Sequence, residues 1–199
     1  MSPLPLSLET ERLVMRRATA ADLTFLTELH LDPEVTRYLG GDGSPRPPEA
    51  TRTWLEKTMR WYEAEDVGQF LVLRAEDDEP LGRAGFGIFE VEEVPSNADG
   101  SHTATWGPGS AAPGRAVQRV LEVGYTFAQR FWGSGFATEA ARAWFAYALG
   151  EYGATEAASV IHADNAGSLR VAQKLGLEPA PLRLRMDGQP CRLFVRRRR

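Results

Sequence analysis

Residues 121–141, LEVGYTFAQRFWGSGFATEAA, decide the fold of this 199-residue chain. The stretch begins as a β-rich run, breaks at a turn that contains Gly133 and Gly135, and continues as a strong helical pattern. The first backbone N–H groups of a helix have no partner inside the helix and carry a partial positive charge. Because glycine lacks a Cβ atom, the backbone of such a turn can approach a ligand closely. A strand, a glycine turn and a helix in this order predict a binding site for a phosphate or diphosphate.

A glycine pair of this kind is most often only a turn, so its neighbours decide how it is interpreted. No Gly-Lys-Ser/Thr follows, which excludes the nucleoside-triphosphate loop. A third glycine with an acidic residue about twenty positions later is also missing, so a dinucleotide-binding fold is not indicated. What remains is WGSGFATEA at residues 132–140. This segment resembles the diphosphate-binding signature of the GNAT family of N-acetyltransferases, in the form typical of the ribosomal-protein alanine and serine N-acetyltransferases.

Further segments resemble the same family in the same order along the chain. They are ETERLVMR at 9–16, DPEVTRYL at 32–39, PLGRAGF at 80–86, DNAGS at 164–168 and KLGL at 174–177. The resemblance therefore covers nearly the whole chain and implies a single N-acetyltransferase domain over residues 1–199. The implied fold class is α/β (α+β), the GNAT fold. It is a mixed central β-sheet of six to seven strands, flanked by about four helices and splayed between its two central parallel strands.

Hydrophobic periodicity predicts the elements that such a fold needs. Strand-like runs predict strands at 12–17, 70–75, 81–91, 120–127, 157–162, 182–187 and 191–196. Helical spacing predicts helices at 20–31, 48–65, 135–149 and 168–175. The strand–helix–strand order from 120 to 162 predicts two parallel strands joined by a right-handed crossover. This connection places the glycine turn at the carboxyl end of a strand, where ligands bind.

Two segments depart from this pattern. Residues 92–118 are rich in Gly, Pro, Ser, Ala and Asn, and they form a longer connection than is usual in the family, so they predict a mobile loop insertion. Residues 196–199 are four arginines and form a basic C-terminal tail. Because no aromatic residues are interleaved and no zinc or helix-turn-helix spacing lies nearby, the tail does not favour specific nucleic-acid binding. The remainder of the chain is acidic, which suits a cationic acceptor.

The composition is that of a soluble globular protein, with 43% hydrophobic and 25% charged residues. No apolar run approaches the roughly 20 residues that span a bilayer, so no membrane partner is expected. The N-terminus lacks the basic start and apolar stretch of a signal peptide, which predicts a cytoplasmic location. The single cysteine, Cys191, lies in a strand-like run and is interpreted as structural. His30, His102 and His162 lack metal-ligand spacing, so no metal is expected.

The resemblance implies that acetyl-CoA is the cofactor and acetyl donor, with CoA as the product. Backbone N–H groups of residues 132–137 would bind its diphosphate, and the strand edge at 125–127 would pair with its pantetheine arm. The cofactor-binding residues expected on this basis are Tyr125, Phe127, Trp132, Gly133, Ser134, Gly135, Phe136, Ala137, Asn165 and Ser168. Asn165 would hold the pantetheine or an ordered water, or alternatively only shape its turn.

Acetyl transfer from a thioester to an amine needs a neutral amine, a donor to the developing oxyanion and a proton for the departing thiolate. By resemblance, Glu122 is the candidate general base, acting directly or through water. The alternative is a carboxylate on the strand face that pairs with an arginine. A glutamate with an ordinary pKa of about 4.3 is a poor base for an ammonium, so the site must raise that pKa or relay the proton through solvent. Ser168 is the candidate that protonates the thiolate, and it could also cap the helix that begins there.

The predicted function is the transfer of an acetyl group from acetyl-CoA to a primary amine by direct attack in a ternary complex. The branch favours a protein or peptide N-terminal amine as the acceptor. Acetylation of an amino acid, a polyamine or an antibiotic is the alternative, as is a non-catalytic module that binds acyl-CoA. The segments 32–43 and 92–118 are expected to wall the amine pocket. A homodimer through the C-terminal strands or the helices is compatible with the sequence.

Overall fold

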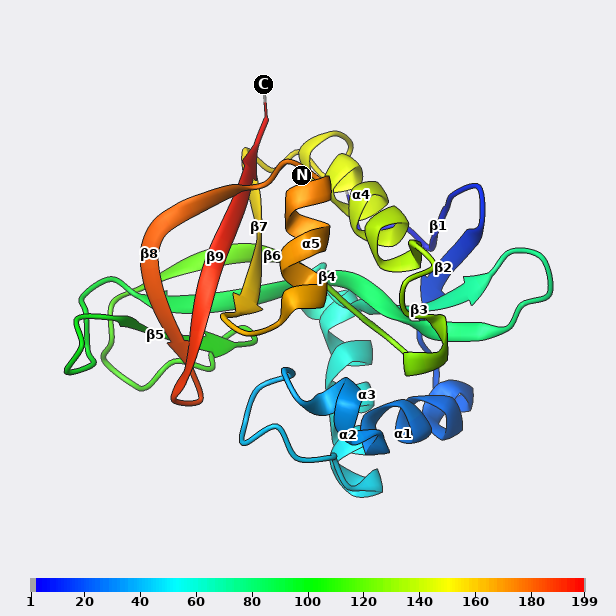
Figure 1. The fold of residues 1–199 in the computed structure, drawn as a ribbon, viewed down its shortest axis with the longest axis horizontal. Coiled ribbons are helices and arrows are strands. Elements are labelled where there is room, and N and C mark those ends of the chain that lie inside the picture. The colour runs from blue at the N-terminus through cyan, green and yellow to red at the C-terminus, as the bar shows by residue number, and fades with distance from the viewer. Residues whose placement is uncertain (1–2, 199) are drawn as a thin grey trace.

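A computed structural model describes residues 3–198 and shows one mixed sheet flanked by helices (Figure 1). Within these residues the sheet has nine strands. They are β1 (Ser7–Glu9), β2 (Leu13–Arg17), β3 (Gln69–Arg74), β4 (Pro80–Glu92), β5 (His102–Trp106), β6 (Val117–Phe127), β7 (Glu156–His162), β8 (Glu178–Met186) and β9 (Gln189–Arg197). The helices are α1 (Leu23–Leu31), α2 (Pro33–Thr36), α3 (Pro48–Ala64), α4 (Phe136–Leu149) and α5 (Ala166–Lys174).

The predicted class is confirmed, and every strand and helix that the periodicity indicates is present to within a few residues. The described part of the chain adds three short elements, β1, β5 and α2, so the expected six to seven strands and about four helices were too few. The addition of α2 has a local cause. Pro33 occupies its first turn, and the side chain of Asp32 accepts a hydrogen bond from the Glu34 N–H at 2.9 Å, which is a typical N-cap.

Six of the strands close into a ring. β4 pairs with β5 and β6, β5 continues to β8, β8 to β9, β9 to β7, and β7 back to β6. Every one of these strands contributes to a shared cluster of buried side chains: Phe89, Val91, Ala104, Val120, Ala158, Leu184, Cys191, Leu193 and Val195. Closing the ring removes two exposed edges, and the common core stabilises it by burial of apolar surface.

The prediction that residues 92–118 are a loop throughout is wrong, because this segment contains one strand of the ring. β5 lies inside this segment and pairs with β4 on one side and with β8 on the other. The connection after β5 is also attached to the sheet, because the Glu90 carboxylate accepts backbone hydrogen bonds from Gly109 at 2.8 Å and Ala111 at 2.9 Å. The mobility of the segment stays a prediction.

Helices cover the two faces of the sheet, with α1, α2 and α3 on one side and α4 on the other (Figure 1). Trp144 of α4 is fully buried, and its ring centroid lies 4.8 Å from that of Phe70 and 4.9 Å from that of Phe86. On the opposite face, α1 and α3 bury leucine and tryptophan side chains against Leu71 of β3. The two packed faces fix β3, β4 and β6 as a rigid platform between them.

β6 and β7 are adjacent parallel strands that pair over only a short length. Their register contains the single pair Glu122 and Ala158. One residue further on, the Ser159 hydroxyl donates to the Val123 carbonyl at 2.7 Å, and beyond this point the strands separate. The splay that the family resemblance implies is therefore present, and it leaves residues 124–127 of β6 without strand partners on the β7 side.

Replacing Ser159 by Ala is expected to lower the free energy of unfolding by about 1–2 kcal/mol, because the buried Val123 carbonyl then loses its donor. Urea denaturation followed by fluorescence measures this change. Ser7→Ala is the matched control, since Ser7 is exposed on β1. Equal stability of the two variants would show that the hydroxyl does not hold the strands together.

The basic C-terminal residues belong largely to the folded structure. Arg196 and Arg197 end β9, and Arg197 forms an ion pair with Glu156 at 2.7 Å. Arg198 donates from Nε to the Leu149 carbonyl at 2.8 Å. Arg199, the last residue of the predicted tail, lies outside the described residues. Across residues 3–198, none of the helices has both the length and the apolar character needed to cross a bilayer.

Candidate active site

The glycine turn leads from the end of β6 into α4. Gly133 and Gly135 have positive φ angles of 80° and 86°, a region that favours glycine, and Gly135 is the N-cap of α4. The first helical hydrogen bond runs from the Glu139 N–H to the Gly135 carbonyl at 3.0 Å. The N–H groups that precede it, those of residues 136–138, point out of the helix end, where an anion can accept their hydrogen bonds.

A groove of about 400 Å³ runs along this turn between β6, α4 and α5. It is lined by nine of the ten residues predicted to bind the cofactor: Tyr125, Phe127, Trp132, Gly133, Gly135, Phe136, Ala137, Asn165 and Ser168. The exception is Ser134, which is exposed in the turn. The Trp132 indole donates to the Phe127 carbonyl at 2.8 Å and so ties the turn to the end of β6.

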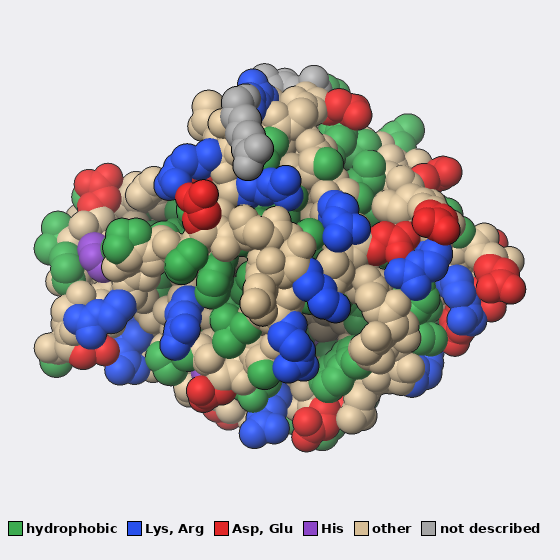
Figure 2. Space-filling view, turned by 45° about the horizontal axis from the view of Figure 1, so that its top comes forward, with side chains coloured by type: hydrophobic (Ala, Val, Ile, Leu, Met, Phe, Trp, Pro, Cys, Tyr) green, Lys and Arg blue, Asp and Glu red, His purple; other side chains and the backbone are tan. Residues whose placement is uncertain are grey.

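Basic side chains also lie along the groove, from Arg37 before the loop to α3 and from Arg170 and Lys174 of α5. Figure 2 shows Lys and Arg side chains spaced across the middle of the face that it presents. An open glycine turn, unpartnered N–H groups and nearby cations together fit the phosphate groups of CoA.

A cluster of side chains at the base of α4 positions the turn, and no local sequence pattern indicates this cluster. Arg12, just before β2, donates from Nε to Glu139 at 2.7 Å and from Nη1 to the Ser134 carbonyl at 3.1 Å. Glu139 also accepts a hydrogen bond from Thr10 at 2.6 Å. Glu139 lies in the first turn of α4, where the helix dipole favours an acid, and it also bonds to residues before β2. It links the N-terminal strands to the phosphate turn across more than a hundred residues of sequence.

The variant Arg12→Ala is expected to weaken acetyl-CoA binding about two- to fivefold, because the turn loses one tie and a half-exposed ion pair contributes modestly. Calorimetric titration with acetyl-CoA gives the affinity. Arg74→Ala is the control, since it breaks a similar ion pair, with Asp77 at 2.8 Å, in the turn between β3 and β4. A loss of affinity shared by both variants would point to a general effect on the fold.

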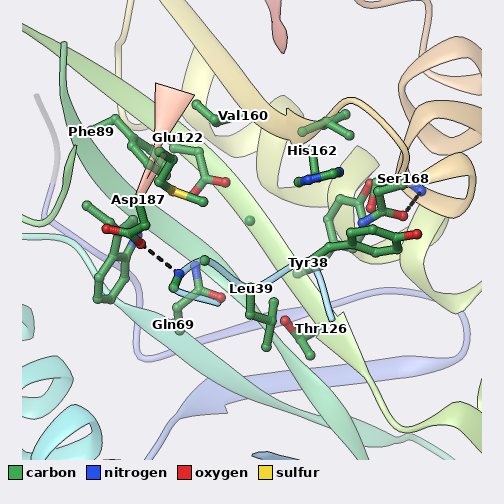
Figure 3. Close-up of a pocket in the computed structure, with 18 of the residues that line it drawn as sticks. Tyr38, Leu39, Gln69, Phe89, Glu122, Thr126, Val160, His162, Ser168 and Asp187 are labelled. Carbon is green, nitrogen blue, oxygen red and sulfur yellow. Dashed lines mark hydrogen bonds between the residues drawn. The ribbon is translucent and has the colours of Figure 1, made fainter. Parts of the chain in front are cut away.

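Glu122 of β6 lies in a second cavity, of about 670 Å³, on the other side of the splay. Figure 3 shows its side chain among the lining residues, with the carboxylate turned toward the cavity. Two glycines leave room for it. A Cβ atom at Gly87 would lie 3.1 Å from one carboxylate oxygen of Glu122, and a Cβ atom at Gly124 would lie 2.8 Å from the same oxygen.

The electrostatic environment of Glu122 suits a base. The residue is 8% exposed, and burial raises its pKa to about 8, although the positive charge of Arg83 opposes the rise. Within residues 3–198 its carboxylate forms no ion pair, so the alternative of a strand-face carboxylate paired with an arginine does not describe it. The predicted need for a raised pKa is met by desolvation.

At the junction of groove and cavity, the structure separates the roles of Asn165 and Ser168. Asn165 is the N-cap of α5, and its side chain accepts a hydrogen bond from the Ser168 N–H at 3.0 Å. The alternative that Ser168 caps this helix is therefore wrong. Ser168 lines the cavity beside Tyr125, whose pKa burial raises to about 12.

The groove and the larger cavity meet at the splay. Six residues line both: Tyr38, Leu39, Tyr125, Thr126, Asn165 and Ser168. The larger cavity is walled by part of the segment 32–43 and, from 92–118, by Thr105, Trp106 and Ser110. A molecule bound in the groove by its phosphates can therefore present its far end to a second molecule beside Glu122. This geometry is that of a group transferase with a phosphate-bearing donor.

The chain belongs to the GNAT acetyltransferase family, whose domain model, described as "Acetyltransferase (GNAT) domain", matches residues 12–178. It is similar to an uncharacterized N-acetyltransferase, p20, of Bacillus licheniformis, with 24% identity over 86% of this chain and 82% of that protein. It also resembles the uncharacterized protein YkkB of Bacillus subtilis, with 29% identity over 96% of this chain and 95% of that protein. The protein is accordingly an acetyl-CoA-dependent N-acetyltransferase.

Solved structures share the fold. An acetyltransferase from Agrobacterium tumefaciens superposes with a TM-score of 0.72 at 21% identity, covering 100% of this chain and 97% of the other. RimL, a ribosomal L7/L12 α-N-protein acetyltransferase solved in complex with CoA, superposes with a TM-score of 0.67 at 14% identity, covering 99% and 98%. No group of three or more His, Cys, Asp or Glu side chains that could hold a metal ion occurs among residues 3–198.

Proposed function

We propose that this enzyme acetylates the N-terminal amine of a protein or peptide that enters the cavity beside Glu122. The observation that carries this proposal is the meeting of the CoA groove and the Glu122 cavity at the splay between β6 and β7. An amine held there would lie next to a buried carboxylate and to the end of the donor groove. Bound acetyl-CoA supplies the thioester, whose acetyl group the amine receives by direct attack in a ternary complex.

The properties of Glu122 favour an α-amine over a lysine-type amine. An N-terminal α-amine has a pKa of about 7.7–8.0, whereas a lysine side chain has one of about 10.4. A base with a pKa of about 8 is matched to the first and poorly matched to the second. Glu122 would accept the proton of the attacking amine, directly or through one water molecule.

The shape of the cavities beside Glu122 supports a peptide, rather than a compact small molecule, as the acceptor. The Glu122 cavity continues into a further cavity of about 380 Å³, and the two share Tyr38, Gly40, Gly41, Asp42, His162 and Met186. A peptide with its first residue beside Glu122 would have room for the residues that follow. The loop before α3 and the hairpin of β8 and β9 form the sides of this path.

Ser168 is proposed to return a proton to the departing sulfur. Ser168 lies where the groove meets the cavity, next to Tyr125, and its backbone N–H is fixed by the Asn165 side chain. The N–H groups of β6 beyond Val123 that face away from β4 have no partners in β7, which leaves them available to the pantetheine amides and the thioester oxygen. Asn165 would act mainly by fixing the start of α5, and Ser134 through its backbone.

Calorimetric titration and thiol release test this function. The purified protein should bind acetyl-CoA more tightly than ATP, and it should release thiol with a peptide that has a free N-terminus. The same peptide with a blocked N-terminus and an internal lysine should be inert. Thiol release only with the blocked peptide or with a polyamine would overturn the assignment of the acceptor. Failure to bind acetyl-CoA would overturn the assignment of the groove.

A further inference from the structure

Two arginines face the cavity that holds Glu122. Arg83 comes from β4 and is 7% exposed, and Arg46 comes from the loop before α3 and is half-buried. Both line the cavity, and within residues 3–198 neither forms an ion pair with a carboxylate. Buried cations in proteins are normally paired, because removing a charge from water is costly. One buried and one half-buried arginine around the same cavity therefore call for an explanation.

Arg83 is held rigidly by neutral partners. Its Nε atom donates to His30 at 3.2 Å, its Nη1 atom donates to Gln69 at 3.1 Å, and its guanidinium lies 4.8 Å from the centre of the Trp54 ring. His30 accepts this bond at Nε2, so its Nδ1 carries the proton and faces the Thr51 hydroxyl at 3.2 Å. Burial lowers the pKa of His30 far below its ordinary value, which keeps the ring neutral. The Nη2 atom of Arg83 has no hydrogen-bond partner in the described chain.

Arg46 is positioned next to it. Its backbone N–H donates to the His30 carbonyl at 2.9 Å, and its Nη2 atom donates to the Leu39 carbonyl at 3.2 Å. These bonds leave Nε and Nη1 without partners among residues 3–198. Burial and then the charge of Arg46 lower the pKa of Arg83 to about 9, so the two guanidinium groups repel each other. A bound anion would offset the repulsion between the two guanidinium groups and the cost of burying them.

The acidic side chains around the cavity act on the two arginines only at longer range, Glu122 on Arg83 and Asp187 on Arg46, and among residues 3–198 none of them forms an ion pair with either arginine. Asp187 is exposed in the β8–β9 turn and accepts a hydrogen bond from the Gly41 N–H at 2.8 Å (Figure 3). Asp42 is exposed and accepts one from the Ser44 N–H at 2.9 Å. Glu122 is the proposed base that accepts the proton of the amine. A carboxylate on the acceptor matches the remaining donors, because a guanidinium presents its N–H groups in the geometry that carboxylates accept.

We infer that Arg83 and Arg46 bind a carboxylate of the acceptor close to its amine, so that the enzyme selects acidic acceptors. This inference rests on the proposed function, because it places the acceptor beside Glu122. The carboxylate has two possible sources with the same chemistry. One is the side chain of an N-terminal Asp or Glu in a peptide, and the other is the α-carboxylate of a free amino acid. The two arginines would act as specificity-determining residues, with Gln69 and His30 as the residues that position Arg83.

The test is a comparison of kcat/KM for matched acceptors. The peptides differ only in the first residue, which is Asp, Glu, Ala or Lys, and free aspartate and alanine form the second arm. The wild-type enzyme is expected to prefer the acidic peptides over the alanine peptide by about 10- to 100-fold, the range expected for hydrogen bonds between charged groups. A preference for the free amino acids over every peptide would identify the α-carboxylate as the source.

The variants Arg83→Gln and Arg46→Gln are expected to lose this preference, measured as the ratio of kcat/KM for the Asp peptide to that for the Ala peptide. The ratio is the readout because the charge of Arg83 also lowers the pKa of Glu122, so Arg83→Gln should slow every acceptor near that pKa. Arg60→Gln is the matched control, since Arg60 is exposed on α3. Because Arg83→Gln removes a network of buried hydrogen bonds, the thermal unfolding of this variant is measured alongside its activity. Arg46→Gln changes a residue in a loop and gives an independent result.

A uniform loss of rate for all acceptors in both variants would overturn the inference, as would a wild-type enzyme without a preference for acidic peptides. If neutral peptides are acetylated without preference, only this inference fails. If no peptide is acetylated, the proposed function fails.

Discussion

Replacing Glu122 by Gln is expected to lower kcat by about 100- to 10,000-fold, the range for loss of a general base. The amide keeps the size of the side chain between Gly87 and Gly124 but cannot accept the amine proton. Acetyl-CoA affinity should stay unchanged, because Glu122 lines the acceptor cavity and does not line the CoA groove. Thiol release at saturating substrates gives kcat, and calorimetry gives the affinity.

The pH dependence identifies the titrating group. The wild-type pKa of about 8 means that the carboxylate, the active form, accumulates as pH rises through that value, so kcat should rise with pH there. The Gln variant should lack this rise. Glu56→Gln, in an exposed position on α3, is the control and should keep the wild-type profile. Matching profiles in wild type and Glu122→Gln would remove Glu122 from the mechanism.

Stability should respond in the opposite direction to activity. The folded-state pKa of Glu122, about 8, is raised above the ordinary value of a glutamate, so between these values the folded protein holds a proton that the unfolded chain releases. The free energy of unfolding therefore falls as pH rises through this window. Glu122→Gln does not titrate, so at pH values above the folded pKa it should be more stable than the wild type. A variant that is inactive and also more stable cannot owe its inactivity to unfolding.

The local part of the fold could be predicted because its signals lie close together in the sequence. The strand at 120–127, the glycine turn and the helix at 135–149 match β6 and α4 to within three residues. Alternation, positive φ at glycine and helical spacing each act over a few residues, so a single sequence contains them. The strands predicted at 182–187 and 191–196 are joined in the same local way, through a turn in which Asp187 and Gly188 have positive φ angles.

The closure of the ring could not be predicted in this way. β5 is five residues long in a segment rich in Gly, Pro and Ser, and its pairing with Leu184 and Arg185 of β8 spans about eighty residues of sequence. A short strand that is stabilised by distant neighbours has no strong local pattern. Helix α2 was missed for a related reason, since four residues are too few to show a helical period.

The residues of the site also differ in whether a local sequence pattern indicates them. Glu122 and the residues of the glycine turn carry recognisable motifs, but the Arg12–Glu139 tie and the Arg46–Arg83 pair exist only through tertiary contacts. Overall charge does not decide the acceptor. The chain outside its C-terminus is acidic, which suits a cationic acceptor, whereas the cavity beside Glu122 holds two arginines together with Asp42, Glu122 and Asp187. Placement of charge in the fold, rather than its sum, determines what a cavity binds.

Replacing Gly135 by Val is expected to raise the dissociation constant for acetyl-CoA by about 10- to 100-fold. Gly135 has a φ of 86° at the start of α4, and a β-branched residue there costs about 1–3 kcal/mol of backbone strain. A new Cβ atom would lie 3.4 Å from Arg12 Nη2, an ordinary contact, so the effect should come from the backbone and not from a collision. The turn would relax to another conformation and move the N–H groups that precede Glu139.

Gly114→Val separates this effect from strain in general. Gly114 has a φ of 80° and open space around its Cβ position, and it lies outside the CoA groove. Both variants should lose stability to a similar extent, but only Gly135→Val should weaken acetyl-CoA binding in a calorimetric titration. Unchanged affinity in Gly135→Val would mean that the diphosphate does not rest on this turn. The proposed path of the donor runs from the glycine turn along the groove to the splay beside Glu122. If the diphosphate does not bind at the turn, the donor must reach Glu122 by a different path.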